Sequence, residues 1–318
     1  MRSVLEHPWH PLVALPVLVA LVALPWVLQT IDEPFYIVLA GRILVYALIA
    51  SSLNLIVGFG GMVCFGHAAF LGAGAYVVAI LMHHGIESAY LAWPAAVIVA
   101  AVVALIVGAI SLRTRGVYFI MITLAFAQMV YYLFVSLKAY GGDDGLPLPL
   151  RSVVGFDLDL KSDTTFYYVA LAFFVVVFYG LARLVNARFG RVLQGIRENE
   201  TRMEAAGFPV FRYKLIAFVL AGAIAGLGGV LLVNLTGLAS PNLLHWTQSG
   251  MLLIMVILGG VGFLYGGFLG AAAVLLLEEV IAAYTIHWQL GVGLVLLAVV
   301  LYAPNGLSTL LRRRRGHG

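Results

Sequence analysis

Six polar side chains interrupt the long apolar runs of this sequence, and they are the residues best placed to do chemistry inside a membrane. They are Asn54, His67, Tyr76, Thr123, Gln128 and Asn234. In hydrocarbon each must find a hydrogen-bond partner or water, so such residues either join helices or line a path for a polar solute. We take them as candidates for a translocation path, with hydrogen bonding between helices as the competing role.

Catalytic chemistry has little support. His67 could pair with Ser51 or Ser52 only across a long stretch of chain, and the adjacent aspartates Asp143 and Asp144 fall in a loop that we place outside the membrane. The sequence has no Gly-x-x-x-x-Gly-Lys-Ser/Thr phosphate loop and no metal-ligand spacing. We therefore expect neither an enzyme nor a cofactor or metal. Any energy for transport must come from another chain or from an ion gradient.

Residues 183–214 form a charged segment within an otherwise apolar chain. It contains ten charged residues: Arg183, Arg188, Arg191, Arg197, Arg202, Arg212 and Lys214 against Glu198, Glu200 and Glu204. So polar a stretch cannot lie in hydrocarbon, and its excess of basic residues predicts a position on the cytoplasmic side.

Part of the charged segment has the pattern of an amphipathic helix. Between Arg191 and Ala206 the apolar residues fall mostly on one helical face: Val192, Leu193, Ile196 and Met203. Gly207 would cap this helix and Pro209 would prevent its continuation, whereas Glu200 and Glu204 would repel each other by a few tenths of a kcal/mol. A short helix of this kind suits a groove in another protein. A helix lying on lipid headgroups is the alternative.

Composition identifies the chain as a membrane protein. It is 63% hydrophobic and 10% charged, whereas about 25% charge is usual in soluble domains. Ten apolar runs have helix-spanning length: residues 11–29, 39–59, 62–82, 90–112, 116–137, 165–186, 213–236, 248–265, 267–286 and 287–303. The predicted fold class is therefore an all-α polytopic membrane protein. Because the basic residues lie at span ends, the net charge of +4 indicates orientation rather than nucleic-acid binding.

Three basic clusters agree on one topology. The charged segment lies four spans before the tail Arg312–Arg315 and two spans after Arg113 and Arg115, so all three are expected inside. The loop at 138–164 carries five aspartates and is expected outside. The sequence thus predicts one transmembrane domain over 1–318, with a cytoplasmic loop at 187–212 and both termini cytoplasmic.

The 35 glycines are concentrated in the spans. Close packing of helices accounts for most of them, but a glycine pair can also mark a broken or re-entrant helix. Residues 61–75 and 259–273 share eight of fifteen positions, which suggests an internal repeat of the kind common in transporters. The span count makes the two copies point the same way, whereas an inverted repeat would need opposite directions. The polarity of the repeat therefore stays open.

Several motifs resemble one family. They are Ser52-Leu53-Asn54-Leu55 with Gly66-His67-Ala68-Ala69-Phe70, Arg115-Gly116-Val117-Tyr118-Phe119 with Thr123-Leu124-Ala125, Gly141-Gly142-Asp143-Asp144-Gly145-Leu146, Arg197-Glu198-Asn199-Glu200 with Glu204-Ala205-Ala206-Gly207, and Pro304-Asn305-Gly306-Leu307. In this order, over about 250 residues, they resemble the permease subunits of branched-chain amino-acid ABC importers, of the LivM type. The general ABC-importer motif places three residues between Glu-Ala-Ala and Gly; here Gly207 follows directly, so that motif is only partly met.

The resemblance implies a mechanism. Such a chain would form half of a transmembrane channel in the inner membrane, paired with a second related permease. Two cytoplasmic ATP-binding subunits would drive it, and a soluble substrate-binding protein would deliver the solute. The charged segment would hold the coupling helix, which gives one set of ATPase-coupling candidates: Arg191, Ile196, Arg197, Glu198, Asn199, Glu200, Met203, Glu204 and Gly207.

Other functions remain open at this point. Permeases for urea or short amides resemble those for branched-chain amino acids, so they are the near alternative. An ion-coupled secondary transporter is the alternative from another class, and it would need intramembrane carboxylates. Only Glu278 and Glu279 qualify, and neither has an evident basic partner in the sequence.

Overall fold

The computed structural model describes residues 11–29, 34–155, 160–302 and 306–307. Within them, each of the ten predicted spans corresponds to a helix: α1 (Pro11–Gln29), α2 (Pro34–Asn54), α3 (His67–His83), α4 (Ala89–Ser111), α5 (Val117–Ser136), α6 (Asp163–Asn186), α9 (Val210–Thr236), α10 (Trp246–Gly259), α11 (Gly266–Ala282) and α12 (Trp288–Tyr302). The predicted all-α polytopic class is therefore confirmed.

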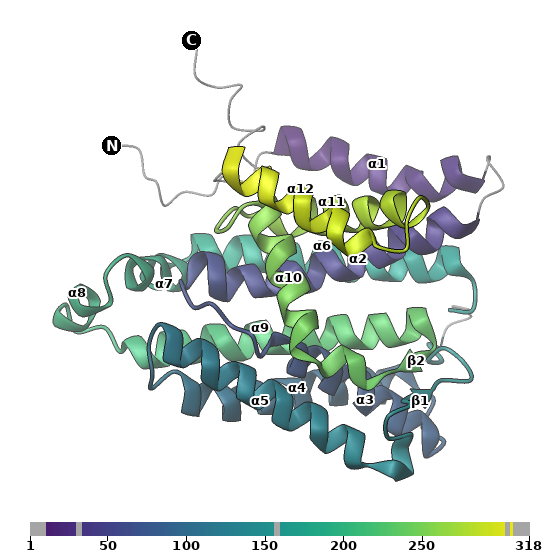
Figure 1. Cartoon of the computed structure of the whole chain (residues 1–318), viewed down its shortest axis with the longest axis horizontal. Coiled ribbons are helices and arrows are strands. Elements are labelled where there is room, and N and C mark those ends of the chain that lie inside the picture. Colours follow the sequence, from purple (N-terminus) through teal and green to yellow (C-terminus); the bar gives the residue numbers. More distant parts are fainter. Residues whose placement is uncertain (1–10, 30–33, 156–159, 303–305, 308–318) are drawn as a thin grey trace.

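The helices pack in layers around α9 and α2. On one side of α9 lie α3 and α4, with α5 beyond them, and on the other side lies α2. α2 in turn packs against α6, α10 and α11, while α1 and α12 lie on the outside of that group (Figure 1). The largest fully buried side chains, such as Tyr76, Tyr167 and Phe218, lie between these layers.

Small residues set the distance between α3, α4 and α9. A Cβ added at Gly74 of α3 would overlap the backbone of Gly226 in α9, and one added at Gly222 would overlap the Ala104 methyl group of α4. Because lipid gives helices no hydrophobic reason to associate, close backbone approach supplies the attraction through van der Waals contact. Close packing thus explains these glycines, as the composition suggested.

Two glycine-rich breaks interrupt the helical spans. α2 ends in a buried π-helix, η1 (Leu55–Phe59), and residues 60–66 then run without helix until α3 begins. Residues 260–265 separate α10 from α11 in the same way, with positive φ at Gly260 and Gly262. The structure thus shows the predicted broken segments. Both possible repeat copies, residues 61–75 and 259–273, contain a break and the first part of the 17-residue helix that follows it.

The breaks also shift span boundaries from the predicted ones. The predicted span 62–82 begins as a helix only at His67, and the predicted span 248–265 ends at Gly259. In the described part of the chain, five helices are long and apolar enough to cross a membrane, and α3 and α10 are shorter apolar helices. α2 begins five residues earlier than its predicted span, so Arg42 lies about two turns inside it rather than near its end.

The two ends of the molecule differ in composition. At one end lie the basic loop 112–116 and the two short helices of the charged segment, α7 (Arg188–Glu198) and α8 (Glu200–Ala205) (Figure 1). At the other end the short strands β1 (Leu146–Pro147) and β2 (Leu238–Ala239) pair antiparallel. Beside them are the short 3-10 helices η2 (Lys138–Tyr140) and η3 (Pro241–Leu244). The described parts of the predicted loop 138–164 therefore lie opposite the charged segment.

Candidate functional site

The charged segment folds as two helices rather than the single helix predicted over Arg191–Ala206. α7 ends at Glu198 and α8 begins at Glu200, with Asn199 extended between them at φ −156° and ψ 98°. The Asn199 side chain accepts a hydrogen bond from the Arg202 backbone N–H at 2.9 Å. Asparagine is a favoured N-cap residue, so Asn199 starts a second helix where periodicity alone continued the first.

The end of the amphipathic pattern is as predicted. Gly207 has φ +84°, and its N–H donates to the Glu204 carbonyl at 2.9 Å. The next N–H, of Phe208, donates to the Met203 carbonyl at 3.1 Å. This pair of bonds is a glycine C-cap of the Schellman type, and α9 starts immediately after Pro209.

The apolar stripe of α7 faces its own chain, which corrects the expectation of a stripe open to a partner. Leu193 is fully buried and Ile196 is 3% exposed, because α7 lies against α6, η1 and α9. The apolar surface that remains open follows α8 instead. Phe208 is 38% and Phe211 41% exposed, and Met203 is partly exposed beside them.

Ion pairs fix α8 against the rest of the molecule. Arg115 Nη2 lies 3.3 Å from Glu200 Oε1 and 3.0 Å from Glu204 Oε1. Lys214 Nζ lies 2.6 Å from Glu200 Oε2, with the Lys214 side chain only 10% exposed. The expected repulsion between Glu200 and Glu204 is therefore offset by a shared arginine from the α4–α5 loop. Sequence spacing could not indicate this partner, which lies 89 residues from Glu204.

Arg197 connects α7 to the first glycine break. Its Nη1 donates a hydrogen bond to the carbonyl oxygen of Gly58, inside η1. Its aliphatic stem packs on Gly61, where an added Cβ would come within 2.8 Å of the Arg197 Cγ. A Cβ at Gly262, in the second break, would come within 2.8 Å of Arg197 Nη1. The guanidinium thus lies between the two breaks.

Asn54 joins the same two breaks from within α2. Its Oδ1 accepts from the Gly262 N–H at 2.9 Å, and its Nδ2 donates to the Phe263 carbonyl at 2.8 Å. A Cβ at Gly58 would overlap the backbone of Gly262. We call Asn54, Gly58, Arg197 and Gly262 the glycine junction. Residues from three distant parts of the sequence meet there.

The second break also receives the end of the described chain. Leu307 N–H donates to the Leu258 carbonyl of α10 at 2.8 Å. A Cβ at Gly306 would come within 2.7 Å of the Gly260 nitrogen. Three of the sequence motifs, around Asn54, Arg197 and Gly306, therefore converge at this end of the molecule.

His67 has a hydrogen-bond partner, Ser52, that its spacing in the sequence did not indicate. Its Nε2 lies 2.8 Å from Ser52 Oγ, and Ser52 Oγ donates to the Ile49 carbonyl at 2.7 Å. Fifteen residues separate the two side chains, but the break at 60–66 turns the chain back so that α3 begins beside α2. Both residues are fully buried, so the pair joins two helices and no solute reaches it in this conformation.

The other path candidates have separate positions. Thr123 Oγ1 accepts from the Phe65 N–H at 3.3 Å and so fixes the first break to α5. Tyr76 is buried, with its ring centroid 4.4 Å from that of Phe134. Gln128 is partly exposed on α5. Asn54 lies at the glycine junction. The other path candidates lie apart from it and from one another, so the six do not form one cluster.

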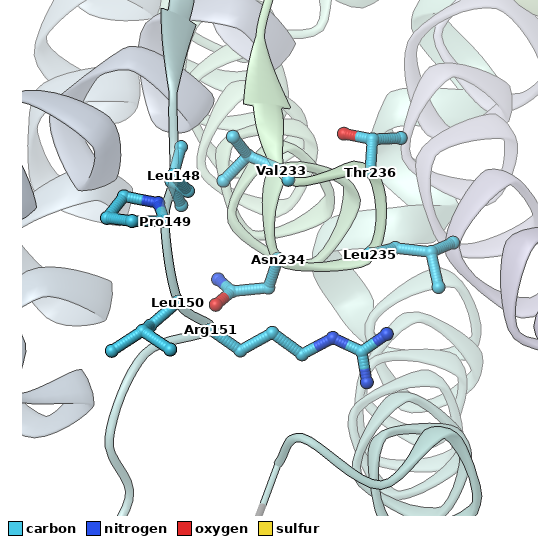
Figure 2. Close-up of a pocket in the computed structure, with 9 residues that line it drawn as sticks. Leu148, Pro149, Leu150, Arg151, Val233, Asn234, Leu235 and Thr236 are labelled. Atoms are coloured by element: carbon cyan, nitrogen blue, oxygen red, sulfur yellow. The ribbon is translucent and has the colours of Figure 1, made fainter.

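Asn234 lines a pocket of about 190 Å³ (Figure 2). The pocket lies beside the β1–β2 ribbon. Asn234 Oδ1 accepts from the Ser152 N–H at 2.8 Å, and Nδ2 donates to the Val230 carbonyl. Arg151, which also lines the pocket, pairs with Asp163 at 2.6 Å. These groups fasten the loop 146–155 to α9 and α6.

A charged pair inside the spans was missed. Arg42 Nη2 of α2 lies 3.2 Å from Glu278 Oε1 of α11, and the Glu278 side chain is 15% exposed. The expectation that Glu278 lacks a basic partner is therefore wrong. The predicted span 39–59 puts Arg42 close to its end, and no local pattern links it to a carboxylate 236 residues away.

Comparison with known proteins identifies relatives of this chain by sequence. LivM of Escherichia coli K12, a high-affinity branched-chain amino acid transport system permease protein, is 28% identical over 292 residues, covering 85% of this chain and 69% of LivM. A probable LivM of Methanocaldococcus jannaschii is 26% identical, covering 82% of this chain and 90% of the relative. LivH of E. coli K12 has the same identity and coverages.

No solved structure matches the chain significantly. The sequence profile of the family described as branched-chain amino acid transport system / permease component matches residues 35–303. That range contains the glycine junction, the charged segment and most of the motifs that suggested the resemblance. The chain therefore belongs to the family of permease components of branched-chain amino acid transport systems.

Proposed function

We propose that this chain is half of the transmembrane channel of an ATP-driven importer that takes up branched-chain amino acids. A second, related permease completes the channel, two cytoplasmic ATP-binding subunits drive it, and a soluble binding protein delivers the substrate. The observation that carries the proposal is the family match over residues 35–303. The absence of a phosphate loop from the sequence agrees with an ATPase on separate chains.

The α8 region has the properties of a surface for an ATPase subunit. Phe208 and Phe211 are exposed and Met203 is partly exposed, and the same segment carries three exposed arginines: Arg191, Arg202 and Arg212. An apolar centre with a charged rim is the usual anatomy of a protein interface. We name these six residues the docking face. Its basic rim favours an ATPase cleft with acidic edges.

The orientation follows from where the basic loops lie. The loop 112–116 and the charged segment share one end of the molecule, linked by the Arg115 ion pairs. The described start of α1 and end of α12 point toward that end as well (Figure 1). The positive-inside rule then supports a cytoplasmic position for the end that carries α7 and α8, and for both termini.

The test uses the complete importer, with ATPases and binding protein, in liposomes. Leucine uptake should need ATP and persist without an ion gradient. Phe208→Asp and Phe211→Asp should insert normally but release the ATPases on co-purification. The control is Glu87→Lys, a charge change at an exposed position at the opposite end of the molecule. A control such as Val176→Asp is unsuitable, because it would place a charge in lipid.

Three results would each contradict a different part of the proposed function. Uptake by this chain alone in a proton gradient would identify an ion-coupled transporter. Urea uptake without leucine uptake would identify the amide alternative. Retention of the ATPases by both Phe variants would show that α8 contacts lipid headgroups rather than an ATPase.

A further inference from the structure

The contacts of Arg197 point to a role distinct from docking, and the following argument rests on the proposed function. Arg197 lies on α7, next to the docking face, but its guanidinium turns into the molecule and donates to Gly58. Arg197 and Arg202 are both exposed, and neither makes a side-chain ion pair among the described residues; the bond to Gly58 is what distinguishes Arg197. A residue that only contacted an ATPase would not need this inward bond.

The acceptor of that bond is an unusual piece of backbone. Gly58 lies in a buried π-helix, a conformation that is rare and concentrated at functional sites. A π-turn stores an extra residue in the helix, so it can revert to α-helix with a small shift of the chain that follows. The chain that follows here is the first break, residues 60–66, which leads to His67 and α3.

The second break is held to the first by short contacts. Asn54 bonds both Gly262 and Phe263, and Gly58 leaves no room for a Cβ against Gly262. A displacement of Gly58 toward Gly262 must therefore move the α10–α11 turn, and the two Asn54 bonds tie that turn to the end of α2. The two breaks can move as one unit, with Arg197 attached to it.

A small cavity of about 10 Å³, no larger than one water molecule, lies beside Asn54 at this unit. It is lined by Ser51, Asn54, Phe59 and Leu264 together with Leu55, Phe178, Leu181 and Val185. The Ser51 hydroxyl is buried and has no hydrogen-bond partner among the described residues. A close-packed interior resists graded deformation and changes between discrete packings, so a void at the junction is where a second packing can form.

We propose that Arg197 is the positioning residue that transmits ATPase closure to a gate at the cytoplasmic end of the channel. The gate is the pair of glycine breaks. Movement of α7 pulls the Gly58 carbonyl through the Arg197 guanidinium, and Asn54 carries the displacement to Gly262 and the start of α11.

The test separates docking from transmission. Arg197→Met keeps the aliphatic stem that packs on Gly61 and removes the donor to Gly58. In the full importer this variant should retain its ATPases and its ATP hydrolysis, while leucine transported per ATP hydrolysed falls at least tenfold. Arg188→Met is the matched control, because Arg188 is exposed at the start of the same helix; it should behave as wild type.

Cys64 provides a direct reading of the gate. It is the chain's one cysteine, it is fully buried, and it lies in the first break. In the wild-type complex ATP should change the rate of Cys64 alkylation by a maleimide several-fold. In Arg197→Met the rate should no longer respond to ATP.

Gly262→Ala, which crowds the guanidinium from the other side, should reproduce the uncoupling if Arg197→Met fails to fold.

Three results would overturn the proposal. One is normal coupling in Arg197→Met with an ATP response of Cys64 like that of wild type. Another is an ATP-independent Cys64 rate in the wild-type complex, which would show that the breaks do not move. Loss of the ATPases from Arg197→Met would assign Arg197 to docking instead. None of these affects the proposed function, which falls only if the wild-type complex fails to transport leucine with ATP.

Discussion

At the scale of single residues, the Arg42–Glu278 pair shows how charge is accommodated inside the spans. An isolated charge in hydrocarbon is costly and is usually paired or faces water. Here the pair joins α2 to α11, and Arg42 also lies 5.8 Å from the centroid of the Tyr46 ring. The contact therefore connects the helix that ends in the first break with the helix that starts after the second.

Removing one partner of this pair should cost more than removing both. Arg42→Met leaves the Glu278 carboxylate without its cation, and we expect a loss of about 2 kcal/mol or more, given about 3–5 kcal/mol for fully buried pairs. The double variant Arg42→Met/Glu278→Met should recover most of the stability. Thermal unfolding in detergent, followed by Cys64 thiol exposure, measures both. Equal destabilisation by the single and double variants would show that the charges do not interact.

Glu204 offers a second test at this scale. Its pair with Arg115 is exposed, with side-chain accessibilities of 47% and 60%, so it contributes only about 0–1 kcal/mol to stability. Glu204→Arg should leave folding unchanged but repel Arg115 and displace α8, which lowers ATPase retention. Arg115→Glu/Glu204→Arg should restore it. A Glu204→Arg variant with full retention and transport would instead favour α8 lying on anionic headgroups.

Sequence reasoning identified most of these residues but few of their partners. Asn54 and His67 were singled out because polar groups are scarce in apolar runs. Gly262, Ser52 and Arg115 became visible as partners only once the chain was folded, because contacts across 15 to 208 residues leave no local pattern. The direction of Ile196 was predicted wrongly for the same reason: an amphipathic face is evident in sequence, but what covers it is not.

At the scale of elements, the breaks and the tight crossings depend on glycine in different ways. The crossings need glycine for space. Gly74 of α3 faces Gly226 of α9 so closely that a Cβ would overlap its carbonyl oxygen. The breaks need it for conformation, since Gly61, Gly260 and Gly262 have positive φ. Composition predicted both uses but could not assign individual glycines, so helix boundaries near the breaks were misplaced by several residues.

The crossing of α3 and α9 gives a prediction with a built-in control. Gly74→Ala forces the two backbones apart, and overpacking of this kind costs roughly 1–3 kcal/mol. Gly180→Ala makes the same chemical change on α6, where no atom lies within 4 Å of the added Cβ. We expect a lower melting temperature for Gly74→Ala only. Equal melting temperatures for the two variants would mean that the α3–α9 distance is not set by Gly74.

At the scale of the whole molecule, the charge distribution and the fold agree on two chemically different ends. The ten helices were predictable from hydropathy because each buries its backbone polar groups internally, as hydrocarbon requires. Their packing order was not predictable, because α9 contacts α2, α3 and α4 through small residues that periodicity does not distinguish. The tail Arg312–Arg315 and the loop aspartates Asp157 and Asp159 lie outside the described residues.

Topology provides the last prediction, and it tests the arrangement on which the docking face and the gate depend. With Cys64 replaced by Ser, single cysteines at Arg202 and at Asp143 lie on exposed positions at opposite ends. An impermeant maleimide added to intact cells should label Asp143→Cys and not Arg202→Cys, because basic loops stay on the cytoplasmic side. In cells that lack the ATPases, so that the docking face is uncovered, permeabilisation should expose Arg202→Cys to the reagent, which shows that its thiol is reactive. Labelling of Arg202→Cys from outside would invert the molecule, placing α7, α8 and the glycine junction beyond the reach of any cytoplasmic ATPase.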